Sequence, residues 1–450
     1  MDLNIYSIIQ YVIVIGFLAH ILTIQRSSTS TLAWLLIILI QPYIGLPFYL
    51  MFGSRKIIRK EPLLFPFPPD LATVKDPVQK ILLASGSPMA CYNEKIRFLE
   101  NGEMAYETLI KIIKEAKNYI YLETFIFSND QVGHWVLESL TAKAKEGIEV
   151  KILLDSLGAI MPGHPSFKDY KAAGGKISMF MPLIHKPFQG SANLRNHRKL
   201  VVVDDKISMI GGMNIAEEYM GPTALASRWV DLAMTMEGPV VYHIKDLFLF
   251  DWAFATKTEG VIKNNDNVKP KEEKHHAQLV MSGPDIKTDP IYELLLTAIY
   301  SAKKRIWITT PYFVPDESLA KAIELAARRG VDVRLVIPAK SNHRMADFAR
   351  QSYLEQIQNS GATIYQYPKM IHAKLTLVDD SYGFIGSANM DSRSLLLNYE
   401  LGVCLYSIGE IKQLESWCDG IFAVSSTEVE KLTHAHQWFG RLARLFSPLI

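Results

Sequence analysis

The stretch NHRKLVVVDDKISMIGGMN, residues 196–214, has a second copy in IHAKLTLVDDSYGFIGSAN, residues 371–389. In both copies one residue separates a histidine from a lysine, and an aspartate follows after four further residues. A glycine and then an asparagine come next, again at matching distances. One copy is compatible with chance, but two copies with the same spacing indicate an internal duplication of the chain.

The same order of elements precedes each copy and predicts the fold. In each half a buried strand is followed by a helix and then by a second strand that opens with a similar sequence. Strands separated by helices pair in parallel and form layered α/β structure. We therefore predict an α/β fold with two pseudo-symmetric lobes, each a mixed β-sheet flanked by helices. The segments are 119–127, 136–147 and 148–156 in the first half, and 305–314, 318–330 and 331–338 in the second.

Two long apolar runs lie near the N-terminus. The first is IYSIIQYVIVIGFLAHILTI, residues 5–24, and the second is LAWLLIILIQPYIGLPFYLMF, residues 32–52. About 20 helical residues span a hydrocarbon core of roughly 30 Å. We therefore expect residues 1–60 to form a hydrophobic membrane hairpin. Pro42, Gly45 and Pro47 predict a kink, or an interfacial or re-entrant part, in the second run.

Basic residues flank the two runs unequally. The loop between them carries only Arg26, whereas the segment after the second run is strongly basic. Because basic flanks favour the cytoplasmic side, both ends of the hairpin are expected there. This predicts a multi-pass protein of the bacterial inner membrane with a cytoplasmic catalytic part. The basic residues, which are alternatively contacts for anionic lipid headgroups, are Arg55, Lys56, Arg59 and Lys60.

Composition shifts suggest the domain boundaries. Residues 61–87 begin with a proline-rich stretch and are expected to be a linker, followed by a first lobe at 88–256. Residues 257–276 are polar and charged, which is typical of a connection between lobes. The second lobe is expected at 277–450 and ends in an amphipathic segment. That segment is read as an interfacial helix or, alternatively, as a core or dimer helix, which leaves a homodimer open.

Charge and cysteine content exclude some classes. The formal net charge is only +2, so the whole chain offers no electrostatic argument for nucleic acid as a partner. The three cysteines lie far apart and lack the spacing of a metal site.

The residue types of the repeated motif suit a phosphate. Alternate residues of a strand share a face, so His197 and Lys199 point the same way, as do His372 and Lys374. A lysine is unsuited to a metal site, but it is well suited to a phosphate oxygen, and an asparagine amide adds a neutral donor. The asparagines are Asn214 and Asn389.

Two facing half-sites would supply two histidines to one phosphodiester. One imidazole can attack phosphorus while the other protonates the leaving oxygen and later deprotonates the incoming nucleophile. An unperturbed imidazole titrates near pH ~6.5, so both protonation states are accessible. This chemistry requires neither a metal nor a cofactor, and we predict neither.

The duplicated motif resembles the signature of the phospholipase D superfamily, and the chain is similar to its bacterial cardiolipin synthases. The resemblance covers nearly the whole sequence. It rests on the two long motifs, on the hydrophobic hairpin, and on the segments LETFIF, GGMNIAEEY, TPYFVPDE, GSANMDSRS, LNYE and RLFSPLI.

The resemblance implies roles for the motif residues. His197 would be the nucleophile that forms a phosphatidyl-histidine, and His372 the general acid and then base. Residues that would hold the phosphoryl oxygens are Lys199, Lys374, Asn214 and Asn389. The aspartates that complete the catalytic signature, Asp204 and Asp379, are expected to bond backbone near the strand ends.

The resemblance also implies that a downstream carboxylate orients each histidine. We expect Glu400 to orient His372 and Asp231 to orient His197. Beside the first histidine, Arg198 is expected either to meet phosphate or to be solvated at the surface. Two further residues, Glu123 and Arg195, are candidates for contacts with substrate hydroxyls and phosphate, with an ion pair as the structural alternative for Glu123.

The function that the resemblance implies is a phosphatidyltransferase that converts two phosphatidylglycerol molecules to cardiolipin and glycerol. Its partners would be phosphatidylglycerol, cardiolipin and the lipid bilayer. Four alternatives remain: a phospholipase D that uses water, a phosphatidyltransferase that uses serine or ethanolamine, a nuclease, and a lipid-binding protein without catalysis. The near-neutral charge disfavours the nuclease. Both motifs are intact, which disfavours the lipid-binding protein without catalysis.

Overall fold

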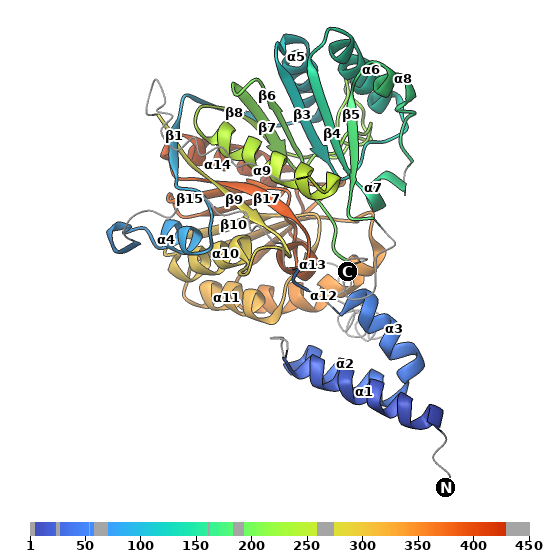
Figure 1. Ribbon diagram of the computed structural model, residues 1–450. Helices are drawn as coiled ribbons and strands as arrows, with labels where there is room; N and C mark the ends of the chain where they lie inside the picture. Colours follow the sequence, from blue (N-terminus) through green and yellow to red (C-terminus); the bar gives the residue numbers. More distant parts are fainter. Residues whose placement is uncertain are drawn as a thin grey trace.

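The computed structural model describes residues 5–23, 28–53, 55–57, 71–160, 163–182, 193–258 and 274–428. The proline-rich start of the first linker, most of the inter-lobe connection and the C-terminal amphipathic segment lie outside the described residues. The described chain forms two large β-sheets with helices on their outer faces, and three N-terminal helices that lie beside them (Figure 1).

The first sheet has seven strands in the order β2-β8-β7-β6-β3-β4-β5. The β3-β4-β5 part is parallel and the remaining pairs are antiparallel. Its strands are β2 Lys95–Leu99, β3 Tyr119–Thr124, β4 Glu149–Asp155, β5 Lys176–Phe180, β6 Leu200–Val203, β7 Ile207–Gly211 and β8 Ala233–Glu237. Its helices are α5 Gly102–Glu115, α6 Gln131–Lys145, α7 Ser156–Ile160, α8 Lys168–Ala172 and α9 Val240–Thr256.

The second sheet repeats this order as β9-β17-β15-β14-β10-β12-β13 and adds β1 at one edge. Although β1 precedes the first sheet in sequence, it pairs with β9. The strands are β1 Cys91–Asn93, β9 His275–Ser282, β10 Arg305–Thr309, β12 Asp332–Pro338, β13 Thr363–Tyr367, β14 Leu375–Val378, β15 Tyr382–Gly386 and β17 Glu400–Leu405, with a separate pair of β11 Phe313–Val314 and β16 Met390–Asp391. The helices are α10 Pro290–Ser301, α11 Glu317–Arg328, α12 Arg344–Asn359, α13 Ser392–Leu396 and α14 Ile408–Val424, and α4 Pro77–Ala84 packs on α10. The matching orders confirm the predicted two-lobed α/β architecture.

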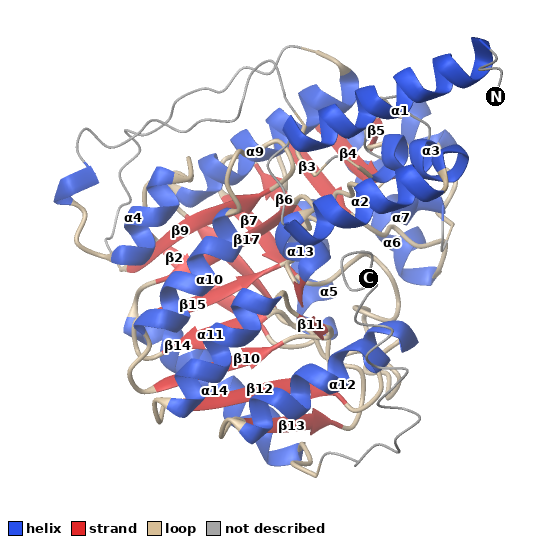
Figure 2. Cartoon of the chain, turned by 90° about the horizontal axis from the view of Figure 1, so that it is seen from below, coloured by secondary structure: helices blue, strands red, loops and turns tan. Residues whose placement is uncertain are grey.

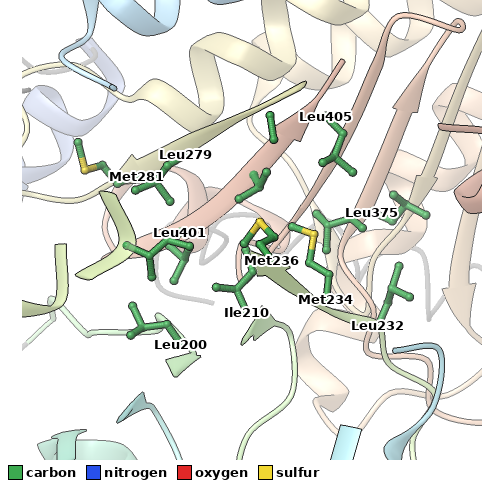
Figure 3. Close-up of a cluster of buried hydrophobic side chains, with 14 of the residues drawn as sticks. Leu200, Ile210, Leu232, Met234, Met236, Leu279, Met281, Leu375, Leu401 and Leu405 are labelled. Carbon is green, nitrogen blue, oxygen red and sulfur yellow. The ribbon is translucent and has the colours of Figure 1, made fainter. Parts of the chain in front are cut away.

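One hydrophobic core joins the inner faces of the two sheets, together with α9 and α14 (Figure 3). Separate cores lie under the outer helices of each lobe. Because alternate strand residues point to opposite faces, each sheet contributes to both a shared and a private core. The shared core therefore packs the two lobes against one another. Residues of the shared core include Leu200, Ile210, Met234 and Met236 from the first sheet, and Leu279, Met281, Leu375, Leu401 and Leu405 from the second.

Side-chain caps fix where the outer helices begin. Asn101 accepts a hydrogen bond from the backbone of Met104 at the start of α5, and Asp130 does the same for Gly133 in α6. In the second lobe Asp316 caps α11. Each such cap stabilises a helix by about 1 kcal/mol.

The N-terminal helices are α1 Ile5–Thr23, α2 Ser28–Ile40 and α3 Pro42–Phe52, grouped to one side of the lobes (Figure 2). The second apolar run breaks at Gln41, which confirms the interruption predicted from its prolines and glycine. A β-carbon at Gly45 would lie 2.9 Å from the carbonyl oxygen of Ile37, so glycine permits the close approach of α3 to α2. Among the described residues, no helix combines the length and the apolarity that a membrane crossing needs.

A basic residue ties these helices to the second lobe. Lys56 Nζ lies within hydrogen-bond distance of the carbonyl oxygens of Gly283 (3.3 Å), Ile286 (2.6 Å) and Thr288 (2.7 Å), and 2.9 Å from Asp289 Oδ1. The Lys56 ammonium therefore directs its donors to the protein, not to the lipid headgroups considered above.

Candidate active site

Backbone hydrogen bonds between the lobes place the two motif histidines. The His197 amide donates to the carbonyl of Tyr399 at 2.8 Å, and the His372 amide donates to the carbonyl of Val230 at 2.6 Å. Parallel bridges join the flanking residues of both pairs. Each histidine is thus fastened to the chain segment that precedes a carboxylate of the opposite lobe.

The carboxylates pair with the histidines across the lobes. His197 Nδ1 lies 3.0 Å from Glu400 Oε2, and His372 Nδ1 lies 2.7 Å from Asp231 Oδ2. The predicted pairing was therefore wrong: Glu400 contacts His197, and Asp231 contacts His372. The reason is the bridging described above, which turns each carboxylate toward the imidazole of the other half.

The residue after the motif glycine lies against the carboxylate of the same lobe, Asp231 in the first and Glu400 in the second. A β-carbon at Gly212 would lie 2.5 Å from Asp231 Oδ1, so only glycine leaves room for that side chain. In the second half Ser387 occupies the equivalent position, and its hydroxyl donates to Glu400 Oε2 at 2.5 Å. The two half-sites are therefore similar in plan but differ in detail.

Both motif lysines are buried beside the imidazoles. Lys199 Nζ donates to the carbonyl of His197 at 2.7 Å. Lys374 Nζ lies 2.7 and 3.0 Å from the two ring nitrogens of His372. Burial lowers the pKa of Lys199 to about 7 and that of Lys374 to about 8. A nearby anion would stabilise the charged form of both ammonium groups, and a phosphodiester supplies such an anion.

The histidines share one electrostatic environment. Burial lowers the pKa of His372 to about 3 and also lowers that of His197. Lys374 further lowers the pKa of His197, and Lys199 further lowers that of His372, so the charges of each half act on the ring of the other. Without ligand both imidazoles are neutral at pH 7.

The two carboxylates balance the lysines. Burial raises the pKa of Asp231 and of Glu400, but the neighbouring histidine and lysine outweigh burial, and both values are lowered overall. The site therefore holds two carboxylates against two lysines, and bound phosphodiester would add a negative charge that favours protonation of an imidazole.

Aromatic rings surround the imidazoles unequally. Tyr219 and Trp229 lie 5.0 and 5.5 Å from the His372 ring, measured between ring centroids, whereas Phe125 lies 5.4 Å from His197. The side chain of His197 is 14% exposed and that of His372 is 5% exposed. The sequence interpretation missed these rings, although Trp229 stands two residues before Asp231.

The motif asparagines take part in local networks at the site. Asn214 Oδ1 accepts from the amide of Ile126 at 3.2 Å, and its side chain also hydrogen-bonds Tyr219. Asn389 Nδ2 donates to Ser394 Oγ at 3.2 Å. Both asparagines are buried.

The motif aspartates do not contact the imidazoles. Asp204 accepts from the amides of residues 117–119 before β3, and Asp379 accepts from those of residues 303–305 before β10. Both residues adopt positive φ, +55° and +51°. The expected backbone bonding of both aspartates is confirmed, and it favours a structural role over a catalytic one.

Replacing Asp379 by alanine should destabilise the fold without altering the chemistry. It removes three charge-assisted hydrogen bonds at a partly exposed turn, so we expect a loss of about 2 kcal/mol and a Tm lower by about 2 °C. The measurement is thermal unfolding together with kcat at a temperature where the variant is folded. Glu115→Ala, which removes an exposed carboxylate that pairs with Lys111, is the matched control. A large loss of kcat in the folded variant would contradict this structural role.

Three polar residues beside the first motif are buried beneath the site. Arg198 is 1% exposed, which contradicts the solvated alternative. Arg195 pairs with Asp155 and donates to the backbone, and Glu123 accepts from Asn196. These contacts are within the protein, and contacts of Arg195 with phosphate and of Glu123 with substrate hydroxyls stay predictions.

The fold and the paired His-x-Lys half-sites define a phospholipase D-like protein with two lobes, and comparisons with known proteins agree. A family model described as cardiolipin synthase, PLD-like domain, matches residues 109–248 and 295–422. A second model, described as phospholipase D-nuclease N-terminal, matches residues 12–54. The crystal structure of phosphatidylserine synthase from Haemophilus influenzae has a TM-score of 0.65 at 16% identity, covers 83% of this chain and 100% of that chain, and supports the fold alone.

Curated relatives are similar over nearly the full length. Cardiolipin synthase 1 of Bacillus cereus is 32% identical, over 97% of this chain and 92% of its own. A cardiolipin synthase of Clostridium perfringens is 34% identical over 87% of each chain. The chain belongs to the cardiolipin synthase family of phospholipase D-like proteins, and it is a phosphatidyltransferase.

Proposed function

We propose that the protein joins two phosphatidylglycerol molecules into cardiolipin and glycerol through a phosphatidyl-histidine at His197. The observation that carries the proposal is the crossed pair of histidine–carboxylate contacts. Because His197 bonds Glu400 through Nδ1, the carboxylate holds the proton on that nitrogen and leaves the Nε2 lone pair for phosphorus. His372 bonds Asp231 through Nδ1, and its ring nitrogens also lie within 3.0 Å of Lys374 Nζ.

The first step forms the covalent intermediate. His197 Nε2 attacks the phosphorus of one phosphatidylglycerol, and the bond from phosphorus to the headgroup glycerol oxygen breaks. His372 gives its proton to that oxygen, and glycerol leaves. The anionic phosphodiester favours the protonated form of His372, so the acid becomes available when substrate is bound, whereas His197 attacks as the neutral imidazole.

The second step returns the enzyme to its starting state. The glycerol hydroxyl of a second phosphatidylglycerol gives its proton to His372, and its oxygen attacks phosphorus. The bond from phosphorus to His197 breaks and cardiolipin is released. The greater exposure of His197 supports its role as the nucleophile, because a lipid phosphodiester must reach it.

We further propose that α1, α2 and α3 place the enzyme in the bacterial inner membrane with both lobes on the cytoplasmic side. The polar members of these helices bond one another: Tyr43 donates to Gln10, and His20 Nδ1 lies 2.9 Å from the Tyr49 hydroxyl. Internal pairing of polar groups is what a hydrocarbon environment favours. Exposed apolar side chains of the group include Ile9, Val12, Ile15, Leu36, Leu39, Ile40, Ile44 and Phe48.

The activity is tested by reconstitution into vesicles that contain phosphatidylglycerol labelled in its headgroup glycerol and in its acyl chains. We expect cardiolipin and free glycerol in a one-to-one ratio. Phosphatidic acid as the main product would identify a hydrolase and overturn the proposal. Added serine or ethanolamine tests the other acceptors, and vesicles of phosphatidylcholine alone are the control.

A further inference from the structure

Arg198 breaks the symmetry between the two motif copies. It occupies the position between histidine and lysine, where the second copy has Ala373. As the neighbour of both His197 and Lys199, its side chain points to the opposite side of the segment. It is buried away from solvent, so it does not reach lipid headgroups at the surface.

The guanidinium of Arg198 crosses to the second lobe. Nε donates to the carbonyl of Glu400 at 3.2 Å, and Nη2 donates to the carbonyl of Ser282 at 3.0 Å. Those two acceptors face each other in the β17–β9 pairing. The guanidinium carbon also lies 5.1 Å from the centroid of the Tyr399 ring. One first-lobe side chain thereby holds Glu400, the first residue of β17, together with Ser282, the last residue of β9, beside the carboxylate that contacts His197.

A buried acid completes this arrangement. Arg198 Nη1 forms an ion pair with Asp251 of α9, which is fully buried. Burial raises the pKa of the neighbouring Glu123 well above its usual range, the nearby Asp251 raises it further, and the two side chains are hydrogen-bonded. A buried ion pair often adds little net stability compared with apolar packing. Its placement behind the site favours a role in geometry.

We propose that Arg198, paired with Asp251, is a positioning residue that fixes Glu400 against His197 and so sets the reactivity of His197. The second half lacks such a support, because the side chain of Ala373 is too short to reach the opposite lobe. Aromatic rings pack around His372 there. The inference rests on the proposed function and deepens it by assigning a support to the nucleophile.

The test compares Arg198→Met and Arg198→Lys with the parent enzyme in vesicles that contain phosphatidylglycerol. A displacement of about 1 Å in a reacting group costs roughly 100-fold in rate. We therefore expect Arg198→Met to lower kcat about 100-fold with KM nearly unchanged. Arg198→Lys should recover part of the rate, because an ammonium keeps the contact with Asp251 but cannot reach both carbonyls in the same way.

The matched control is Arg350→Met. Arg350 is equally buried, donates to the carbonyl of Ala339 and pairs with Asp347, and neither of these partners belongs to the paired half-sites. It should lower Tm and leave kcat of the folded enzyme unchanged. If the Arg198 variants lose no more kcat than this control, or lose affinity with unchanged kcat, the inference is overturned. Arg198→Lys decides the question should Arg198→Met fail to fold.

A single-turnover measurement separates this inference from the proposed function. The rate at which labelled phosphatidyl appears on His197 is followed in each protein. Absence of the adduct in the parent enzyme would reject the proposed function itself. An adduct that forms equally fast in the parent and in Arg198→Met would reject only the positioning role.

Discussion

His197→Ala is expected to eliminate the phosphatidyl-enzyme and to lower kcat by roughly 10⁴-fold or more. The reason is that this imidazole is the proposed site of covalent attachment. His372→Ala should slow both steps but still permit attachment to His197. The substitution removes the general acid and base and leaves the nucleophile in place. The measurement is mass spectrometry of the protein after brief exposure to labelled phosphatidylglycerol, under alkaline conditions that preserve phosphohistidine.

The control for both variants is His343→Ala. His343 caps α12 by accepting from the amide of Ala346, and it lies outside the paired half-sites. It should retain the adduct and the rate. An adduct that moves to His372 in the His197→Ala variant would exchange the roles of the two histidines.

Glu400→Gln and Asp231→Asn are expected to impair different steps, and each should lower kcat by roughly 10²- to 10⁴-fold. Because Glu400 contacts His197, its loss should slow formation of the adduct. Because Asp231 contacts His372, its loss should slow the proton transfers, and the adduct should persist after it has formed. Single-turnover rates of adduct formation and decay distinguish the two.

Glu410→Gln is the matched control for these variants. Glu410 is a buried carboxylate that also pairs with a histidine, His275, but outside the site. Its replacement should leave both rates unchanged. The opposite result for the site variants, with Glu400→Gln affecting only decay and Asp231→Asn affecting only formation, would mean that each carboxylate serves the histidine of its own half.

Much of the fold was predictable because the duplicated pattern is long and the hydrophobic strands are distinct. The two sheets repeat one strand order, and His197, Lys199, His372 and Lys374 lie where the motif places them. The crossed pairing was not predictable, because sequence distance says nothing about which segments bridge two lobes.

Burial was also hard to predict for charged residues. Arg198 looked equally suited to phosphate and to solvent, and only its contacts with carbonyls of β9 and β17 show that it lies in the interior. The pairing of β1 with β9 likewise depends on the folded topology, since β1 precedes the first sheet in the chain. Local patterns carry no information about such long-range neighbours.

The exchange of carboxylates between lobes constrains how such a protein could have arisen. A shorter ancestor with a single copy of this geometry would have carried a histidine and a carboxylate that could not contact each other within one chain. Two identical chains would have had to associate, so that the carboxylate of each chain contacted the histidine of the other. Gene fusion would then have freed the halves to diverge, as Gly212 and Ser387 or Arg198 and Ala373 have done.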